Sequence, residues 1–202
     1  SPDGSQVLFQ SDRDGGGAFL VSAFGGTAPR LVAPGARDAR FSPDGTRIAT
    51  DKHLDAQTWD AETGKPLITF SGHTGDVLSI AYSPDGSLLA TTGHDRTVRL
   101  WDAASGRQIH VLRGHRKVVL GVAFSPDGSL LATSSRDGTV RIWDVAMGTQ
   151  HLVLRGSPGE PFYSFSGLTP AFSPDGSRVT SGGWKRTPIW DLATGKISMT
   201  LP

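Results

Sequence analysis

Residues 90–102 of the chain read ATTGHDRTVRLWD, and residues 132–144 read ATSSRDGTVRIWD. Two stretches this similar indicate that the chain is built from a repeated unit. Two independent markers recur with it: SPDG begins at Ser1, Ser42, Ser83, Ser125 and Ser173, and Trp-Asp begins at Trp59, Trp101, Trp143 and Trp190. Their shared spacing of roughly 42 residues predicts a repeat architecture for nearly the whole chain.

The pattern inside a unit predicts β-strands. In VLSIAY, residues 77–82, we expect Leu78, Ile80 and Tyr82 on one face of a strand and the alternate residues on the other. The SPDG that follows predicts a tight turn, because proline fixes φ, aspartate bonds nearby backbone and glycine accepts a positive φ. Segments 87–92, 97–102 and 107–112 then complete four short antiparallel strands, with no helix.

The first and last units depart from this pattern. Nothing precedes SPDG in the first unit, so we expect three strands there and about four in each of the others. In the last unit Pro170 and Pro188 fall inside expected strands. Proline removes a ladder donor, so these strands are predicted to be edges, bulged or wrongly assigned.

Composition excludes several classes of function. The chain has 202 residues, 37% of them hydrophobic, with 20 Lys plus Arg against 19 Asp plus Glu and no cysteine. This balance gives no net field for nucleic acid or a membrane surface, and no apolar run is long enough to span a bilayer. No disulfide, thiol chemistry or cysteine-ligated zinc is possible, and the histidine spacing suits no metal site, so we predict no cofactor.

Units three and four contain GH, SPDG, a turn aspartate and Trp-Asp in this order. Through this order the chain resembles the WD-repeat β-propeller family. The resemblance implies an all-β propeller of four-stranded antiparallel blades, with about five blades present in one domain, residues 1–202. The approximate units are 1–33, 34–70, 71–112, 113–154 and 155–202. The first unit lacks Trp-Asp and looks more like propeller repeats of the TolB and prolyl-oligopeptidase type.

The resemblance also implies a buried hydrogen-bond chain in each of the two central units. Its members would be His73, Thr91, Asp95 and Trp101 in one unit, and His115, Thr133, Asp137 and Trp143 in the next. Thr92 and Ser134 are alternatives for the hydroxyl. A catalytic triad needs one site with an exposed nucleophile, whereas this pattern recurs in successive units, so we interpret it as structural and expect no enzyme activity.

The variable positions at the opposite end of the units from SPDG are the candidates for partner binding, because loops on a rigid scaffold carry function. They are Thr74, Asp76, His94, Arg96, Arg116, Lys117, Arg136, Trp184, Lys185 and Arg186. Tryptophan and arginine are favoured at interaction hot spots, which draws attention to Trp184. Its alternative is a core aromatic that compensates for the missing hydrogen-bond chain.

We therefore predict a non-catalytic scaffold or sensor module for a protein or peptide partner. The excess of arginine over lysine and the absence of asparagine suggest a bacterial source, and the resemblance suggests part of a larger cytoplasmic signalling protein. The alternative is a periplasmic TolB-like or peptidase-associated propeller acting as gate or partner of a hydrolase. We expect an incomplete ring rather than a closed one, with self-association through its open edges.

Overall fold

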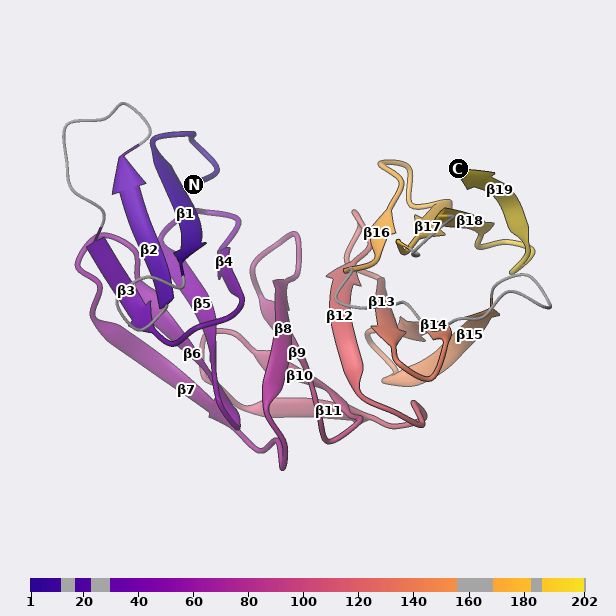
Figure 1. Ribbon diagram of the computed structural model, residues 1–202, viewed down its shortest axis with the longest axis horizontal. Coiled ribbons are helices and arrows are strands. Elements are labelled where there is room, and N and C mark those ends of the chain that lie inside the picture. Colours follow the sequence, from indigo (N-terminus) through magenta and orange to yellow (C-terminus); the bar gives the residue numbers. More distant parts are fainter. Residues whose placement is uncertain (12–16, 23–29, 156–168, 183–186, 202) are drawn as a thin grey trace.

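The computed structural model describes residues 1–11, 17–22, 30–155, 169–182 and 187–201, and these residues form five antiparallel sheets without a helix (Figure 1). We call the sheets blades 1 to 5 in chain order. Blade 1 has three strands, β1 (Gln6–Ser11), β2 (Gly17–Ser22) and β3 (Arg30–Pro34).

The other four blades have four strands each. Blade 2 consists of β4 (Ala39–Phe41), β5 (Arg47–Lys52), β6 (Asp55–Asp60) and β7 (Pro66–Ser71). Blade 3 consists of β8 (Val77–Tyr82), β9 (Leu88–Gly93), β10 (Val98–Asp102) and β11 (Gln108–Leu112). Blade 4 consists of β12 (Val119–Phe124), β13 (Leu130–Ser135), β14 (Thr139–Asp144) and β15 (Thr149–Arg155). Blade 5 consists of β16 (Ala171–Phe172), β17 (Arg178–Thr180), β18 (Thr187–Asp191) and β19 (Ile197–Leu201).

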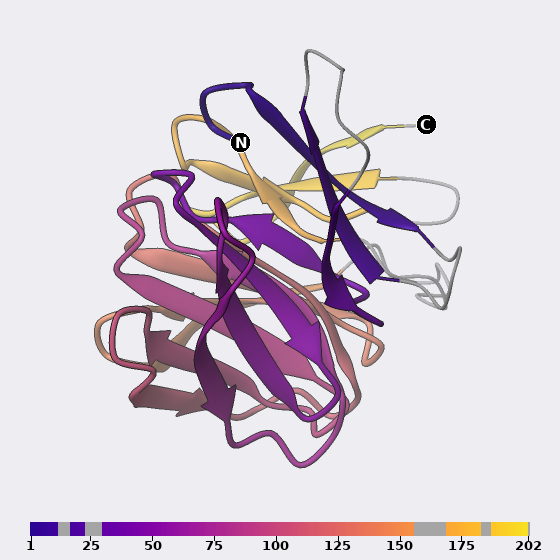
Figure 2. The same ribbon diagram turned by 90° about the vertical axis from the view of Figure 1, so that its left-hand side faces the viewer.

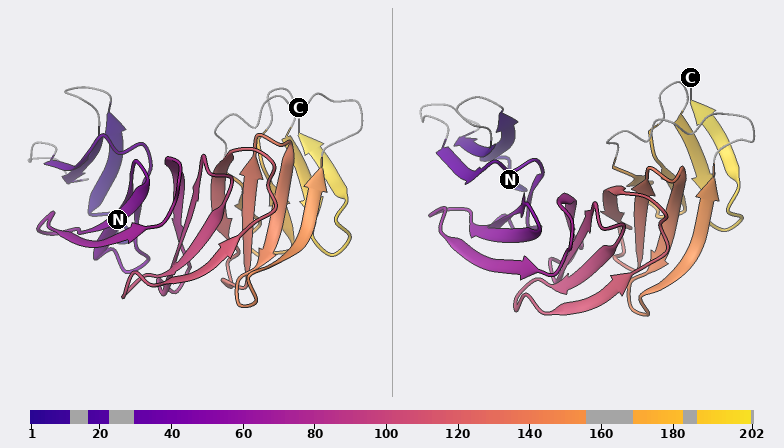
Figure 3. Two further views of the ribbon diagram at one scale, coloured as in Figure 1. Left: turned by 90° about the horizontal axis from the view of Figure 1, so that it is seen from below. Right: turned by 60° about the horizontal axis from the view of Figure 1, so that its bottom comes forward.

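The five blades follow one another along an open arc (Figures 1 and 2). Strands β4, β8, β12 and β16 lie on its concave side, and β7, β11, β15 and β19 lie on its convex side (Figure 1). The two end blades do not close into a ring, as the views from below also show (Figure 3). The fold is therefore the all-β propeller architecture that the sequence predicts, as an arc rather than a circle.

Hydrophobic contacts between blades hold the arc together. Each of the four buried clusters joins two successive blades. Between blades 3 and 4, for example, Val98 and Leu100 of one sheet pack with Val122 and Trp143 of the next. Burying one such side chain stabilises the folded state by roughly 1.5–3 kcal/mol, so the clusters supply most of the driving force for stacking.

A β-bulge interrupts the expected alternation of side chains at the start of β8. The register of β8 against β9 shifts between Val77 and Ser79. Val77 consequently joins Ile80 in the cluster between blades 2 and 3, although strict alternation would place them on opposite faces. The prediction for residues 77–82 was wrong there because an extra residue in one strand resets the two-residue period.

The two prolines of blade 5 have different outcomes. Pro170 lies before β16 and outside any strand, so its assignment to a strand was wrong. Pro188 lies in β18 and pairs with Thr200 of β19, while β17 ends opposite Ile189. Pro188 is thus beyond the end of the β17 ladder, where a missing N–H costs nothing.

The SPDG turns contact one another around the concave side. In blade 3, Gly86 has φ +73°, and its amide donates to the Ser83 carbonyl at 2.9 Å. A Cβ at this glycine would lie 3.4 Å from the Pro43 ring of the SPDG turn before it. The pairs Gly45–Pro2, Gly128–Pro84 and Gly176–Pro126 repeat the contact, so each turn rests on its predecessor.

Candidate functional site

A buried chain of hydrogen bonds crosses blade 4. The imidazole of His115 lies 2.9 Å (Nδ1) from Asp137 Oδ2 and 2.8 Å (Nε2) from Thr133 Oγ1, and the indole N–H of Trp143 donates to the same hydroxyl at 2.8 Å. Because an ionised aspartate can only accept, Nδ1 carries the imidazole proton and Nε2 accepts from the threonine hydroxyl. Every donor in the chain then has one acceptor.

Blade 3 repeats this geometry. His73 lies 2.9 Å (Nδ1) from Asp95 Oδ2 and 2.8 Å (Nε2) from Thr91 Oγ1, and the Trp101 indole donates to Thr91 at 2.9 Å. The structure thus brings together the four residues named for each central unit. Thr91 and Thr133, rather than Thr92 and Ser134, supply the hydroxyl.

This arrangement does not suit nucleophilic catalysis. Thr91 and Thr133 are fully buried, and the His73 and His115 side chains are at most 1% exposed. A nucleophile must reach substrate, and no path from solvent leads to these hydroxyls. The chain of hydrogen bonds can orient and lock loops, but it cannot act on a bound molecule.

Burial sets the protonation of the network. Removal from water lowers the pKa of both His73 and His115, and the opposing charge of the paired aspartate only partly compensates. Burial alone would raise the pKa of Asp137, but hydrogen bonds from His115, Thr139 and the Arg116 amide bring it well below its usual range. We therefore assign neutral histidines and ionised aspartates at neutral pH.

The aspartates also fix the neighbouring loops. Asp95 accepts the Thr74 amide at 3.1 Å, and Asp137 accepts the Arg116 amide at 2.8 Å. The loop before β8 is thereby tied to the turn between β9 and β10, and the loop before β12 to the turn between β13 and β14. Side chains on these loops project from a fixed backbone.

Sequence reasoning missed a pair of arginines beside the network. At Gly72, with φ +157°, a Cβ would lie 2.7 Å from the Arg99 guanidinium, and Gly114 meets Arg141 in the same way. Arg99 also lies 3.8 Å from Asp95 and bonds Gln108. Arginine two residues before the tryptophan in both copies was the available signal, and in both blades it lies against the glycine that precedes the histidine.

Blades 2 and 5 keep the tryptophan without the histidine. In blade 2 the Trp59 indole donates to Thr50 Oγ1 at 2.8 Å. The buried Asp51 carboxylate accepts the amides of Arg37 and Asp38 directly, at 2.6 and 2.8 Å. In blade 5 the Trp190 indole donates instead to the Arg155 carbonyl of blade 4 at 3.0 Å.

The predicted partner-binding residues that the structure describes lie in two groups at the end of the blades opposite the SPDG turns, which we call the top face. The 72–76 loop, with Thr74 and Asp76, meets the turn that carries His94 and Arg96, because the His94 amide donates to the Asp76 carbonyl at 2.9 Å. The 113–118 loop, with Arg116 and Lys117, meets the turn that carries Arg136 through an Arg136–Val118 backbone bond at 3.0 Å.

Exposure divides the same residues further. Thr74, His94, Arg96, Arg116, Lys117 and Arg136 are exposed. Asp76 is half-buried and forms an ion pair at 3.0 Å with Arg37, which lies in the loop before blade 2. Trp184, Lys185 and Arg186 lie outside the described residues.

The described part of the chain has neither a metal-ligand cluster nor a membrane-spanning helix. It contains no group of three or more His, Cys, Asp or Glu side chains placed to hold a metal ion. Nor does any helix long and apolar enough to cross a membrane occur in it.

Comparison with known proteins bears on the two central blades. Residues 64–102 and 106–144 match the family described as WD domain, G-beta repeat. These stretches hold Trp101 and Trp143 with their hydrogen-bond chains. The chain contains two WD repeats.

Three individual proteins are similar to short stretches of the chain. A guanine nucleotide-binding protein subunit beta from Lymnaea stagnalis is 41% identical over 46 residues, which is 23% of this chain and 14% of that protein. The nuclear distribution protein PAC1 of Arthroderma benhamiae is 43% identical over 75 residues, 37% of this chain and 16% of that protein. The PAC1 protein of Trichophyton verrucosum matches to the same extent. This chain therefore aligns with about one-seventh of each relative's length.

The WD repeats indicate a scaffold for protein–protein interaction, of a kind that is generally non-catalytic. These relatives come from a snail and from fungi, so the bacterial source and the TolB-like character of blade 1 stay predictions.

Proposed function

We propose that the chain is a non-catalytic platform whose top face binds an acidic segment of a protein partner. The observation that carries this proposal is an asymmetry between buried and exposed charge. The carboxylates of Asp95 and Asp137 are only 5% and 6% exposed, because the WD hydrogen-bond chains use them internally. The cations Arg96, Arg116 and Arg136 in the same loops face solvent.

The rigidity of the loops supports this role. A backbone amide of each loop donates a hydrogen bond to Asp95 or Asp137 of the buried hydrogen-bond chains. The loops therefore have little conformational freedom to lose when a partner binds. Preorganised surfaces bind more tightly because less conformational freedom is lost on association. Arginine in particular can form bidentate hydrogen bonds with a carboxylate.

The wider context is a further part of the proposal. We place the platform in a larger cytoplasmic signalling protein, of bacterial source by its composition. Identification of the domains encoded on either side tests this placement: a signalling domain supports it, whereas a hydrolase domain or export signal favours the gating alternative.

Reversal of the top-face charge tests the binding site. The variant Arg116→Glu with Arg136→Glu is compared with Arg107→Glu with Lys196→Glu, which changes net charge equally at exposed positions on the opposite end of the blades. Affinity capture with quantitative mass spectrometry, followed by titration of the purified partner, is the measurement. A partner retained by the wild type and the control but lost by the top-face variant supports the proposal.

Equal loss from both variants would contradict it, as would a captured species that disappears on nuclease treatment. The second outcome would also overturn the expectation that the chain does not bind nucleic acid.

We further propose weak self-association through the ends of the arc. Blade 1 exposes Val7 and Leu31, and blade 5 exposes Met199 and Leu201, each by more than 40%. Apolar faces of this kind favour contact with another surface. Light scattering is expected to show an average mass that rises with concentration, and a constant monomeric mass would count against it.

A further inference from the structure

We propose that the end of the arc opposite the top face holds a second binding site, a cavity that receives an apolar side chain of a basic peptide. The cavity has a volume of about 650 Å³ and is lined by residues from all five blades. This volume falls in the range of small-ligand sites, about 300–1,000 Å³. The site is independent of the top face and lies at the SPDG turns.

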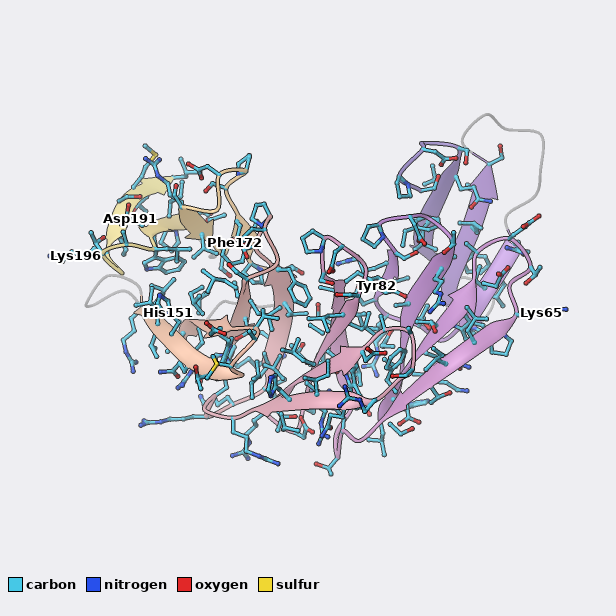
Figure 4. All side chains as sticks on the ribbon, turned by 180° about the vertical axis from the view of Figure 1, so that it is seen from behind. Lys65, Tyr82, His151, Phe172, Asp191 and Lys196 are labelled. Carbon is cyan, nitrogen blue, oxygen red and sulfur yellow. The ribbon has the colours of Figure 1, made fainter. Side chains whose placement is uncertain are left out.

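Four aromatic residues are among those that line the cavity. Phe41, Tyr82, Phe124 and Phe172 all line it, and each is the residue directly before an SPDG turn. All four are half-buried, and each packs against one of the hydrophobic clusters between blades. Tyr82 and Phe172 lie on either side of the opening in Figure 4. The repeat itself thus generates a ring of aromatic groups.

The described side chains that line the cavity carry little charge. Arg40 is the one charged side chain among the described lining residues, and it forms an ion pair with Asp38 at 2.8 Å. Small side chains, Ala81 and Ala123, leave the space between the rings open. An apolar side chain placed here would leave water without burying a charged wall group.

The SPDG turns that line the cavity, which we call its rim, each carry an acidic residue next to the lining proline. Pro2, Pro43, Pro84 and Pro126 line the cavity, and an exposed aspartate follows each of them: Asp3, Asp44, Asp85 and Asp127. Hydrogen bonds from the neighbouring serine or threonine residues lower the pKa of every one of these carboxyls, that of Asp3 to about 2. At neutral pH all four are therefore ionised.

Charge complementarity selects the occupant. A rim of four fixed carboxylates around an apolar, aromatic-walled cavity repels acidic segments and attracts arginine or lysine. The best match is a short peptide segment of a protein partner in which one aromatic or aliphatic residue is flanked by basic residues. The apolar side chain enters the cavity, and the flanking cations lie against the rim.

The test uses the whole chain and a fluorescein-labelled probe peptide with one tryptophan between pairs of arginines and a glycine at each end. Fluorescence anisotropy measures its binding to the wild type, to Ala123→Trp, which fills the cavity, and to Ala104→Trp, which adds the same side chain at an exposed turn outside it. We expect saturable binding to the wild type, at least about tenfold weaker binding to the cavity variant, and an unchanged affinity for the control.

A second variant keeps the proposal testable if Ala123→Trp does not fold, as judged by circular dichroism. Asp85→Asn with Asp127→Asn leaves the cavity intact and should weaken binding and reduce its salt dependence. The top-face variant Arg116→Glu with Arg136→Glu should retain full affinity for the probe, which separates this site from the proposed function. Absence of saturable binding to the wild type, equal binding by the cavity variant, or equal binding of a probe with glutamates in place of arginines would overturn the proposal.

Discussion

Blades 4 and 2 place a tryptophan at the same position of their third strand but surround it differently. In blade 4, Trp143 shares the Thr133 hydroxyl with His115, which continues the chain to Asp137. In blade 2, Trp59 bonds Thr50, and no histidine follows. Packing of the indole is thus common to both blades, whereas the complete hydrogen-bond chain is an addition that fixes the top-face loops.

The same comparison explains how blade 2 manages without histidine. Asp51, beside Thr50 in β5, reaches the backbone of the preceding loop directly through two amides. Burial raises the pKa of this carboxyl, and the hydrogen bonds from Asp38 and Arg37 oppose that rise only in part. A single aspartate replaces the histidine–aspartate pair, at the cost of a poorly solvated charge.

The largest effect is expected when the tryptophan itself is removed. Trp143→Ala leaves a cavity in the cluster between blades 3 and 4 and should lower the free energy of unfolding by about 3–5 kcal/mol. Trp59→Ala should cost less, because Trp59 is only half-buried. Urea unfolding followed by circular dichroism measures both losses. Equal losses would show that the different burial of the two indoles does not determine how much each contributes to stability.

Removal of the hydroxyl sharpens the comparison. Thr133→Val deprives both Trp143 and His115 of a buried partner and should cost about 2–4 kcal/mol, at about 1–2 kcal/mol for each lost partner. Thr50→Val deprives only Trp59 and should cost about half as much. Since the two substitutions are identical, a double-mutant cycle with Trp143→Phe separates the histidine's share. Similar losses for both threonines would mean that the histidine adds little.

A dependence of stability on pH should distinguish the two kinds of blade. The folded pKa of His73 and of His115 is below the ordinary value of 6.5, so the unfolded chain binds more protons just below that pH. The stabilisation is complete above pH 6.5 and is lost as the pH falls towards the folded pKa.

Urea midpoints at neutral and mildly acidic pH measure this dependence. The double variant His73→Gln with His115→Gln should be less stable at neutral pH and show a smaller drop on acidification. If the double variant lost as much stability below pH 6.5 as the wild type does, the pH dependence would come from groups other than these two histidines.

The smallest effect is expected in blade 5. The Ser181 hydroxyl is buried and has no hydrogen-bond partner among the described residues. Ser181→Ala should therefore change the free energy of unfolding by less than about 0.5 kcal/mol or stabilise the fold slightly, because it removes an unsatisfied polar group. A loss as large as that of Thr133→Val would reveal a hydrogen-bond chain in this blade too.

Much of the architecture could be predicted from the sequence because the same pattern of strands and turns recurs in several units. The blades, the SPDG turns and the members of the two central hydrogen-bond chains were all predicted, since each depends on residues near one another in the repeated unit. The bulge in β8 could not be predicted, because it depends on the register of pairing with β9 rather than on composition. The Asp76–Arg37 ion pair was missed because its partners come from two different blades.

The cavity at the SPDG turns was missed for a related reason. Its aromatic residues are about 41 to 48 positions apart in the chain, and one strand pattern shows each of them only as a core residue. Their convergence appears once the blades are stacked in an arc. A site that is formed by residues of several repeats cannot be recognised from the sequence of one repeat.

The contact of each SPDG glycine with the preceding proline has a consequence for how the molecule opens. These contacts, like the four hydrophobic clusters, join only successive blades, so the arc behaves as a linear array of coupled units. When this five-blade chain is studied by itself, we expect fraying to begin at blades 1 and 5, which have one neighbour each among the described residues, and to advance inwards. Amide protons of β9 and β13 should exchange last, so the top-face loops are presented by the part of the array that stays closed longest.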